Sequence, residues 1–496
     1  MKTMNLKFMS MAAIAAMTLC TACSDDDTPG GNGGNGGNGG EGGNDAYSSE
    51  LFLDEANNNA INYDFSNTFA NAFVGTIDGG ADMPGVNSFF TAAAYRGAVK
   101  ADDNWTAGWT LVNEIGGDNK ADQQAVETLT GTLTENKTLE ANKKYMLSGE
   151  YIVATGATLT IPEGVTILAD ASDDKVDYIL VQQGAKIMAE GTQENPIVMT
   201  ATKTEASAWG GIHICGKAHS NVEGGTGTSE IGNATYGGSD DSDNSGVLKY
   251  IRLEYTGYAF DSEHEANGIS FYGVGNGTTV EYCQAYKGSD DGFEFFGGSV
   301  NIRHMVVVSC SDDSFDWTEG WNGKGQFLVA YQEAESTLGF DCDCLMECDN
   351  NGNNFGATPV AHPVIANATL VGNGGSKQGV RLRAGTQVEL YNAIITGKGQ
   401  PLTVETVETE NALKDGTSKL EYVVISDLLN SKENIYTNDL FAAGNGNATQ
   451  HTANLSDLFV GTEEGGKDLS TDEFFTATNY KGAVQADDNW TAGWTL

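Results

Sequence analysis

The sequence predicts an all-β protein whose central part is a parallel β-helix, and three observations lead to this prediction. First, Ser289–Glu294 (Ser-Asp-Asp-Gly-Phe-Glu) recurs as Ser311–Asp316 (Ser-Asp-Asp-Ser-Phe-Asp), and the offset of 22 residues is the length of one coil. Second, runs such as 156–167 alternate apolar and polar residues, as strands do. Third, 64 glycines against 7 prolines suit a turn-rich β protein better than a helical bundle.

Length and charge narrow the functional classes. The 496 residues are enough for several domains or for one long repeat body. The chain has 68 acidic and 26 basic residues, for a net charge of −42. Phosphate recognition needs a basic face, so we expect no nucleic-acid partner. After the N-terminal segment, no apolar run reaches the roughly eighteen residues of a membrane-spanning helix.

The first 22 residues are predicted to be a targeting segment. Lys2 and Lys7 precede an apolar stretch at Met11–Leu19, and Thr21-Ala22 leads into Cys23. This pattern resembles a bacterial lipoprotein signal, which implies that Cys23 is acylated and anchors the chain in the outer membrane. The acidic Ser24–Asp27 resembles the tag that sends some Gram-negative lipoproteins to the cell surface. The alternative is a plain secretory peptide that is cleaved near Ala22.

The segment 23–46 is predicted to hold the acylated Cys23, the acidic tag and a flexible tether. Between Pro29 and Asn44 it consists almost wholly of Gly and Asn, which cannot bury apolar area to offset the entropy of ordering. An anchor, a tether and an acidic body together place the working part of the chain in the extracellular medium.

One segment of the chain is duplicated. Ala101–Leu111 (ADDNWTAGWTL) is identical to Ala486–Leu496, and the similarity reaches back to Phe73 and Phe459. Repeat bodies need caps on their end coils, so we expect the two copies to close the ends of the β-helix or to combine into one module. Their paired tryptophans indicate aromatic packing rather than sugar stacking. The predicted domains are an N-terminal module at 47–120, a β-helix at 121–440 and a C-terminal module at 441–496.

Five runs share one strand pattern and extend the 22-residue offset into a ladder. They lie at 268–271, 292–295, 314–317, 339–342 and 379–382, with spacings of 24, 22, 25 and 40, so the last step is expected to hold an extra coil or a long loop. Alternate residues of a strand point opposite ways. The expected inward stacks are Ile269, Phe293, Phe315, Phe340 and Val380, and Phe271, Phe295, Trp317, Cys342 and Leu382. The expected outward column is Ser270, Glu294, Asp316, Asp341 and Arg381.

The outward column predicts a Ca²⁺ site. Glu294, Asp316 and Asp341, with Asp290 and Asp312 in the preceding turns, would stack at about 4.8 Å, which is unfavourable without compensation. Ca²⁺ takes six to eight oxygen ligands and would remove the repulsion. The alternative is that the aspartates of the turns only bond their own backbone.

The ladder region resembles known proteins. The runs 156–167, 184–200 and 209–214 resemble the opening coils of right-handed parallel β-helix proteins from bacterial surfaces. The stretch 245–335 resembles a large group of bacterial surface lipoproteins with this pectin-lyase-like fold. The resemblance implies a right-handed β-helix of roughly a dozen coils and a place at the cell surface, and it implies no activity.

An enzymatic reading follows from a second resemblance. Many parallel β-helices are pectin or uronate lyases, which use Ca²⁺ on an Asp cluster and a nearby Arg as base. That resemblance implies Arg381 or Arg383 as the base of a Ca²⁺-dependent lyase acting on acidic polysaccharide. Asp312-Asp313 and Arg381–Arg383 also look like two motifs of galacturonan hydrolases, whose Gly-His-Gly is missing here. With these motifs incomplete, the sequence favours a binding or structural role, toward glycan or another envelope component, over an enzyme.

The cysteines outside the targeting segment are expected to be buried thiols or to form one local disulfide. Cys342, Cys344 and Cys348 are close enough in sequence to pair or to hold a soft metal, but no nearby His completes a metal set. The other three are Cys215, Cys283 and Cys310.

Overall fold

The computed structural model describes residues 76–78, 93, 95–100, 125–172, 175–259 and 264–496. The predicted signal peptide, Cys23, the tether and most of the N-terminal module, including its NWTAGWTL sequence, lie outside these residues. The chain divides into two units. In the first, β1 (Ile77–Asp78) pairs antiparallel with β2 (Tyr95–Arg96).

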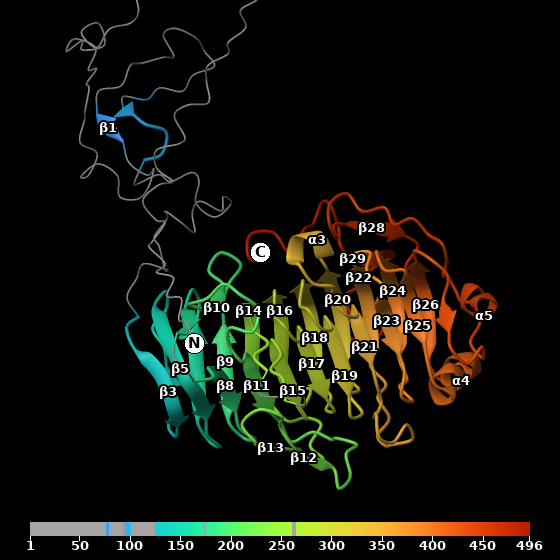
Figure 1. Cartoon of the computed structure of the whole chain (residues 1–496), viewed down its shortest axis with the longest axis horizontal. Helices are drawn as coiled ribbons and strands as arrows, with labels where there is room; N and C mark the ends of the chain where they lie inside the picture. Colours follow the sequence, from blue (N-terminus) through green and yellow to red (C-terminus); the bar gives the residue numbers. More distant parts are fainter. Residues whose placement is uncertain (1–75, 79–92, 94, 101–124, 173–174, 260–263) are drawn as a thin grey trace, which may run out of the picture. The chain divides into compact units, whose positions relative to one another are not determined.

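The second unit contains a right-handed parallel β-helix (Figure 1). One sheet of 23 strands runs from β3 to β27, without the short β12–β13 hairpin. The strands of its first half are β3 (Thr128–Leu133), β4 (Lys137–Thr138), β5 (Lys144–Val153), β6 (Thr158–Pro162), β7 (Thr166–Ala169), β8 (Tyr178–Val181), β9 (Lys186–Glu190), β10 (Ile197–Ala201), β11 (Ile212–Cys215), β12 (Thr226–Thr228), β13 (Thr235–Gly237), β14 (Gly246–Glu254), β15 (Ile269–Tyr272) and β16 (Thr279–Tyr286).

The second half continues the same winding. Its strands are β17 (Phe293–Phe296), β18 (Asn301–Val308), β19 (Phe315–Thr318), β20 (Lys324–Tyr331), β21 (Met346–Cys348), β22 (Val364–Val371), β23 (Gln378–Leu382), β24 (Glu389–Thr396), β25 (Gln400–Val404), β26 (Lys419–Ile425) and β27 (Asn430–Ser431). Strands of successive coils stack in parallel columns. The column that carries the acidic residues runs β8, β11, β15, β17, β19, β21, β23, β25 and β27.

Alternation along these strands builds the core. In β17, Phe293 and Phe295 are buried inside the coil while Glu294 between them points outward. The rings of Phe271 and Phe295 stack at 5.0 Å, and Phe295 stacks on Trp321 at 4.3 Å. Complete burial of such a side chain contributes about 1.5–3 kcal/mol, so the aromatic stack fixes the register of the strands that carry the carboxylates.

The expected register is confirmed for Glu294 and Asp316, which are direct partners, and is wrong at Asp341. β19 pairs with β21, so Asp316 lies opposite Glu347, and Glu347 lies opposite Arg381. Asp341 lies in the loop that follows α3 (Glu335–Leu338), with its Oδ1 3.5 Å from the Nζ of Lys398. The inward places expected for Phe340 and Cys342 belong to Met346 and Cys348.

The physical reason for this correction is a long loop. The segment between β20 and β21 contains α3, and this places Met346–Cys348 rather than Phe340–Cys342 in the column. Since β21 pairs directly with β23, the following long step is also a loop and contains no extra coil of this column.

A second column of residues marks the corner at which β14, β16, β18, β20, β22, β24 and β26 bend. Each bends at one residue with a left-handed backbone, which is uncommon outside glycine. The residues of this bend column are Tyr250, Tyr282, His304, Phe327, Asn367, Asn392 and Tyr422, with φ between 49° and 61°. The rings of Tyr250, Tyr282 and His304 stack at 4.3 and 4.2 Å, and this packing compensates for the strained backbone.

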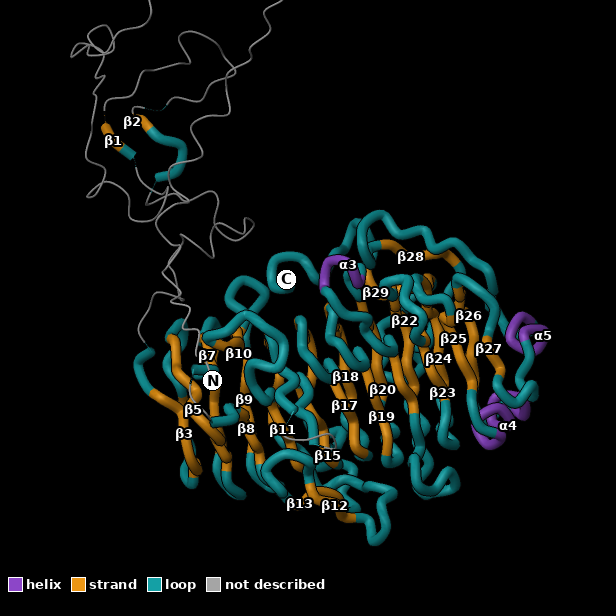
Figure 2. Tube along the Cα trace, viewed as in Figure 1, coloured by secondary structure: helices purple, strands orange, loops and turns teal. Residues whose placement is uncertain are grey.

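The C-terminal module lies along this corner, not across an end of the β-helix. Its strands β28 (Gly461–Glu464) and β29 (Tyr480–Val484) pair antiparallel, and β29 contacts β20, β22 and β24 (Figure 1). The last coil is covered instead by α4 (Val407–Asp415) and α5 (Asn438–Ala442), which place Leu413 and Phe441 in the core (Figure 2). The expectation that the C-terminal copy caps an end is therefore wrong.

Two further expectations concern the cysteines and membrane helices. The six cysteines of the described region are all free and buried, which confirms the expectation of buried thiols and leaves no local disulfide among them. In the same residues, no helix has the length and apolar character needed to cross a membrane.

Candidate functional site

An acidic groove with a volume of about 370 Å³ lies on the outer face of the β15–β23 column. Ten carboxylates and one guanidinium line it. They are Glu230, Glu265, Asp290, Asp291, Glu294, Asp312, Asp313, Asp316, Asp343, Glu347 and Arg381. Such a concentration of like charge is unfavourable unless protons or cations neutralise it.

The coil repeat places these side chains. Each of β17, β19 and β21 follows a turn that carries acidic residues, and each strand then points one further carboxylate outward. The turns contribute Asp290 and Asp291, Asp312 and Asp313, and Asp343, whereas the strands contribute Glu294, Asp316 and Glu347. In-register stacking therefore brings every carboxylate close to its equivalent in the next coil.

Two aspartates of the turns each use one carboxylate oxygen to hold the backbone of the next coil. Oδ1 of Asp291 accepts the backbone N–H of Asp313 at 2.9 Å, and Oδ1 of Asp313 accepts that of Cys344 at 2.6 Å. Oδ1 of Asn267 accepts the N–H of Asp291 at 3.2 Å and begins this ladder. Turn formation thus uses one oxygen of Asp291 and one of Asp313, and each aspartate has a second oxygen available to the groove.

The centre of the groove, along β17 and β19, contains Asp291, Glu294 and Asp316. One oxygen from each lies within 4.8 Å of the other two, a spacing that one cation can bridge. Oδ1 of Asp316 is buried and has no hydrogen-bond partner in the part of the chain that the structure describes. A buried, unpaired carboxylate oxygen is costly, so this atom fits the position of a cation ligand.

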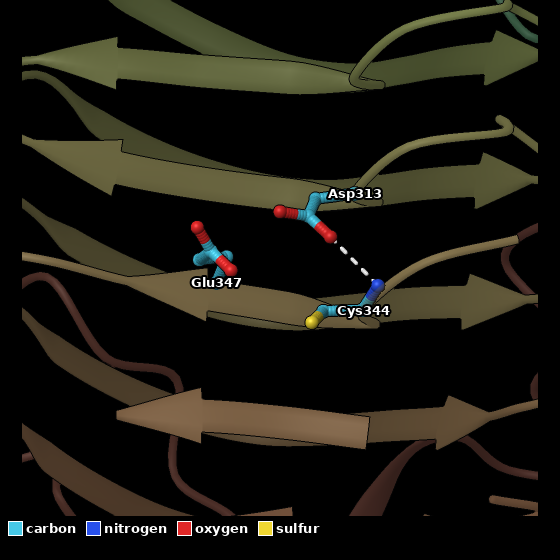
Figure 3. Close-up of side chains that lie close together, drawn as sticks. All are labelled: Asp313, Cys344 and Glu347. Carbon is cyan, nitrogen blue, oxygen red and sulfur yellow. Dashed lines mark hydrogen bonds between the residues drawn. The ribbon is translucent and has the colours of Figure 1, made fainter. Parts of the chain in front are cut away.

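Three further sets of ligand atoms lie equally close. Glu265, Asp290 and Asp312 form one set near the mouth of the groove, and Asp291, Asp312 and Asp313 link it to the centre. The last set combines Asp313, Glu347 and the Sγ of Cys344, and Figure 3 shows the side chains of these residues gathered between successive coils. The groove offers ligands for more than one cation along its length.

Burial and mutual repulsion raise the pKa values of these carboxyls. Burial, with the charge of Asp312 adding to it, raises the pKa of Asp290 to about 7. The pKa values of Asp291, Glu294 and Asp316 lie well above their ordinary range, first because of burial and then because of neighbouring carboxylates. Without a cation, the groove therefore holds protons near neutral pH.

Both arginines of the lyase hypothesis are engaged in ion pairs. Nη1 of Arg381 lies 2.8 Å from Glu347 and its Nη2 3.2 Å from Glu405. Arg383 contacts Glu347 at 2.5 Å and Asp349 at 2.7 Å. Burial lowers the pKa of Arg381, but its hydrogen bonds to the two glutamates outweigh burial and raise the pKa above its ordinary value. Loss of a proton from this guanidinium is thereby disfavoured.

Four of the five predicted ligands line one groove, namely Asp290, Asp312, Glu294 and Asp316, and Arg381 lines it with them. Asp341 is not among the lining residues, and Glu347 occupies its expected position. Glu230 and Glu265 were missed because they lie in loops outside the 22-residue offset, where spacing gives no signal. Glu347 was detectable, since Met346-Glu347-Cys348 carries the same apolar–acidic–apolar pattern as Phe340-Asp341-Cys342.

Comparison with known proteins gives one match. A family model described as a pectate-lyase like beta helix domain matches residues 131–495. No curated protein and no solved structure matches the chain.

Proposed function

The chain belongs to the pectate-lyase-like β-helix family, and from this premise we propose that its acidic groove binds Ca²⁺ in a protein that binds glycan or another envelope component at the cell surface. The observation that carries the proposal is the set of Asp291, Glu294 and Asp316 around the buried, unpaired Oδ1 of Asp316. Hard carboxylate oxygens are the ligands that Ca²⁺ prefers.

The Ca²⁺ would supply positive charge between the stacked carboxylates. Glu294 and Asp316, which are paired across β17 and β19, would hold the ion with the second oxygen of Asp291. The outer carboxylates Asp290 and Asp312 would lie toward the groove mouth, where a bound cation could be shared with an acidic polymer. An acidic glycan is otherwise repelled by this face, so recognition would depend on the cation.

The cellular setting belongs to the same proposal. The lipoprotein-like sequence ending at Cys23 and the Gly/Asn tether support a chain anchored in the outer membrane with its β-helix in the medium. The measurement is mass spectrometry of the mature N-terminus, in which diacylglycerol on Cys23 is expected. An unmodified N-terminus near Ala22 or Cys23 contradicts the anchor and leaves the groove proposal intact.

The cation site is tested by thermal unfolding with millimolar Ca²⁺ and with chelator. Ligand at about 100 times its dissociation constant adds roughly 2.7 kcal/mol of stability, so a clear rise in melting temperature is expected. Asp316→Asn keeps the shape of the side chain and removes its charge. This variant should lose most of the response to Ca²⁺. It should keep its stability in chelator, because the amide, like the protonated carboxyl, carries no charge.

Glu408→Gln is the matched control, since Glu408 is an exposed residue of α4 outside the groove. It should respond to Ca²⁺ as the wild type does. An equal response in Asp316→Asn and Glu408→Gln contradicts the proposed site. If Ca²⁺ raises the melting temperature of none of the three proteins, the acidic residues do not form a cation site and serve only to form the turns.

The second candidate is a Ca²⁺-dependent polysaccharide lyase, and the position of Arg381 in the groove lining is the observation that favours it. Its ion pairs with Glu347 and Glu405 count against a role as base. Incubation with uronate polymers, followed by ultraviolet absorbance of unsaturated products, separates the two functions. Turnover that Arg381→Ala or Arg383→Ala abolishes identifies a lyase, whereas a binding protein retains the polymer without cleavage.

A further inference from the structure

The duplicated modules share the pairing of their described strands as well as their sequence. In both, the described strands pair antiparallel in the same register. The equivalent glycines Gly97 and Gly482 both have a left-handed backbone, with φ of 110° and 96°. The partners are Ile77 with Arg96 and Asp78 with Tyr95 in the N-terminal copy, and Glu463 with Lys481 and Glu464 with Tyr480 in the C-terminal copy.

The C-terminal copy sits in a groove along the bend column, which we call the bend groove. Trp494 is completely buried and meets the rings of Tyr250 and Tyr282 edge-on at 5.6 and 6.1 Å. Trp490 meets His304 edge-on at 4.8 Å. Buried aromatic anchors of this kind carry most of the binding energy of an interface.

Amide side chains of the bend groove hold the backbone of the module. Three buried amides each donate one hydrogen bond to, and accept one from, the main chain of a single module residue. The pairs are Gln284 with Leu496, Gln326 with Thr476 and Asn392 with Lys467, at 2.7 to 3.2 Å. Recognition of the main chain does not depend on which side chain the module carries there.

Every aromatic anchor of the C-terminal copy has an identical counterpart in the N-terminal copy. The bend groove therefore contacts features that both copies possess. The equivalent residues are Phe459 and Phe73, Phe474 and Phe89, Phe475 and Phe90, Trp490 and Trp105, Trp494 and Trp109, and Leu496 and Leu111.

The chain has two modules, but the described coils form only one bend groove with aromatic residues at the corner. Before β14, they turn the same corner at Asn142, Gly164 and Asn195, which present no aromatic ring. The bend groove is itself filled by the C-terminal copy. A second occupant must therefore replace that copy.

We propose that the N-terminal module of a second copy of this chain docks in the bend groove in place of the C-terminal module, and so links chains head to tail. The second copy supplies the same anchors and the same strand register. The C-terminal module of the same chain is covalently attached to the β-helix, and this attachment gives it an effective concentration of about millimolar at the bend groove. At about 10 µM chain, the own module is then favoured about 100-fold, and exchange grows with the local density of chains.

The test uses the full chain with photoreactive benzoylphenylalanine in place of Tyr282, made in ordinary and in ¹⁵N-labelled form and mixed. After trypsin, the N-terminal copy yields the peptide 101–120 and the C-terminal copy the peptide 482–496, so the identical sequences are distinguished. Wild type should cross-link mainly to 482–496 of its own chain. About one cross-link in a hundred should reach 101–120 of another chain. In an equal mixture about half of these should join the two isotopes, and the share should rise with concentration.

Trp490→Ala with Trp494→Ala weakens only the C-terminal copy. Loss of each anchor weakens docking by about thirty-fold. The two losses together, about 900-fold, outweigh the roughly 100-fold advantage of covalent attachment. Cross-links to 101–120 of another chain should then predominate, and light scattering should show oligomers. Adding Trp105→Ala and Trp109→Ala is the matched control and should return the chain to monomers with few cross-links of either kind.

Three results overturn the proposal. One is a double variant that stays monomeric without cross-links to 101–120, and another is a quadruple variant that associates as strongly as the double one. The third is cross-linking to 101–120 only within single chains. If the double variant does not fold, the wild-type series decides alone, because a share of 101–120 that does not rise with concentration excludes exchange.

Discussion

The raised pKa of Asp290 makes a quantitative prediction about stability in the absence of a cation. Asp290 is 8% exposed, and the pKa of its carboxyl rises from 3.8 to about 7 on folding. Between these values the folded state holds a proton that the unfolded state has lost, so the free energy of unfolding falls as the pH rises. One pKa unit corresponds to 1.36 kcal/mol, so this group alone removes about 3 kcal/mol between pH 5 and pH 8.

The assay is urea unfolding followed by tryptophan fluorescence at pH 5, 6, 7 and 8 in chelator. Asp290→Asn should flatten the dependence by about that amount, since the amide does not titrate. Saturating Ca²⁺ at pH 8 should restore roughly 2.7 kcal/mol or more to the wild type, because the ion replaces the lost protons. Glu408→Gln serves as the surface control and should follow the wild type. Identical pH profiles for wild type and Asp290→Asn in chelator would refute the reasoning, because burial of this carboxyl, and the repulsion that adds to it, would then not affect stability.

Three other predictions concern the β-helix itself. Phe295→Ala removes a ring stacked on both sides and should lower the free energy of unfolding by about 3–5 kcal/mol, measured with urea; a loss below about 1 kcal/mol contradicts the central place of this stack. Gly246→Ala should lower the melting temperature strongly, because a Cβ there would lie 1.8 Å from the backbone oxygen of Ile187, whereas Gly352→Ala faces open space and should change little. The six described cysteines, including Cys344, should react with a thiol reagent only after unfolding, and rapid reaction of the native protein contradicts their burial.

The sequence was sufficient for the fold where coils have nearly equal length. The offset between Glu294 and Asp316 is one coil without an insertion, so pattern and spacing agree and the pairing is confirmed. At the next rung they disagree. Asp341 has the expected spacing, but Glu347 is the residue that pairs with Asp316, because the loop with α3 lengthens that coil. Loops can vary in length without disturbing the column of strands. Sequence spacing alone cannot measure such an insertion.

The position of the C-terminal module could not be predicted from the sequence, for another reason. The bend groove is composed of residues one coil apart, such as Tyr282 and His304, and their side chains form a surface only after the coils stack. Trp490 and Trp494 were correctly predicted to pack as aromatics, yet nothing in their own segment indicates which face receives them. Glu230 and Glu265 of the acidic groove could not be predicted for the same reason, since loops bring them to the site only after the coils stack.

The one-coil period of the acidic column has an evolutionary consequence. A coil contributes its carboxylates as a unit, and it contacts its neighbours through parallel strand pairing and through side-chain stacks and hydrogen bonds that repeat from coil to coil. Tandem duplication of a 22-residue segment such as 290–311 would insert one more rung, lengthen the acidic face by about 4.8 Å and leave the older rungs paired as before. Recombination within the coding sequence of such a repeat can therefore adjust the length of the acidic face without a new fold and without a sequence that the chain does not already contain.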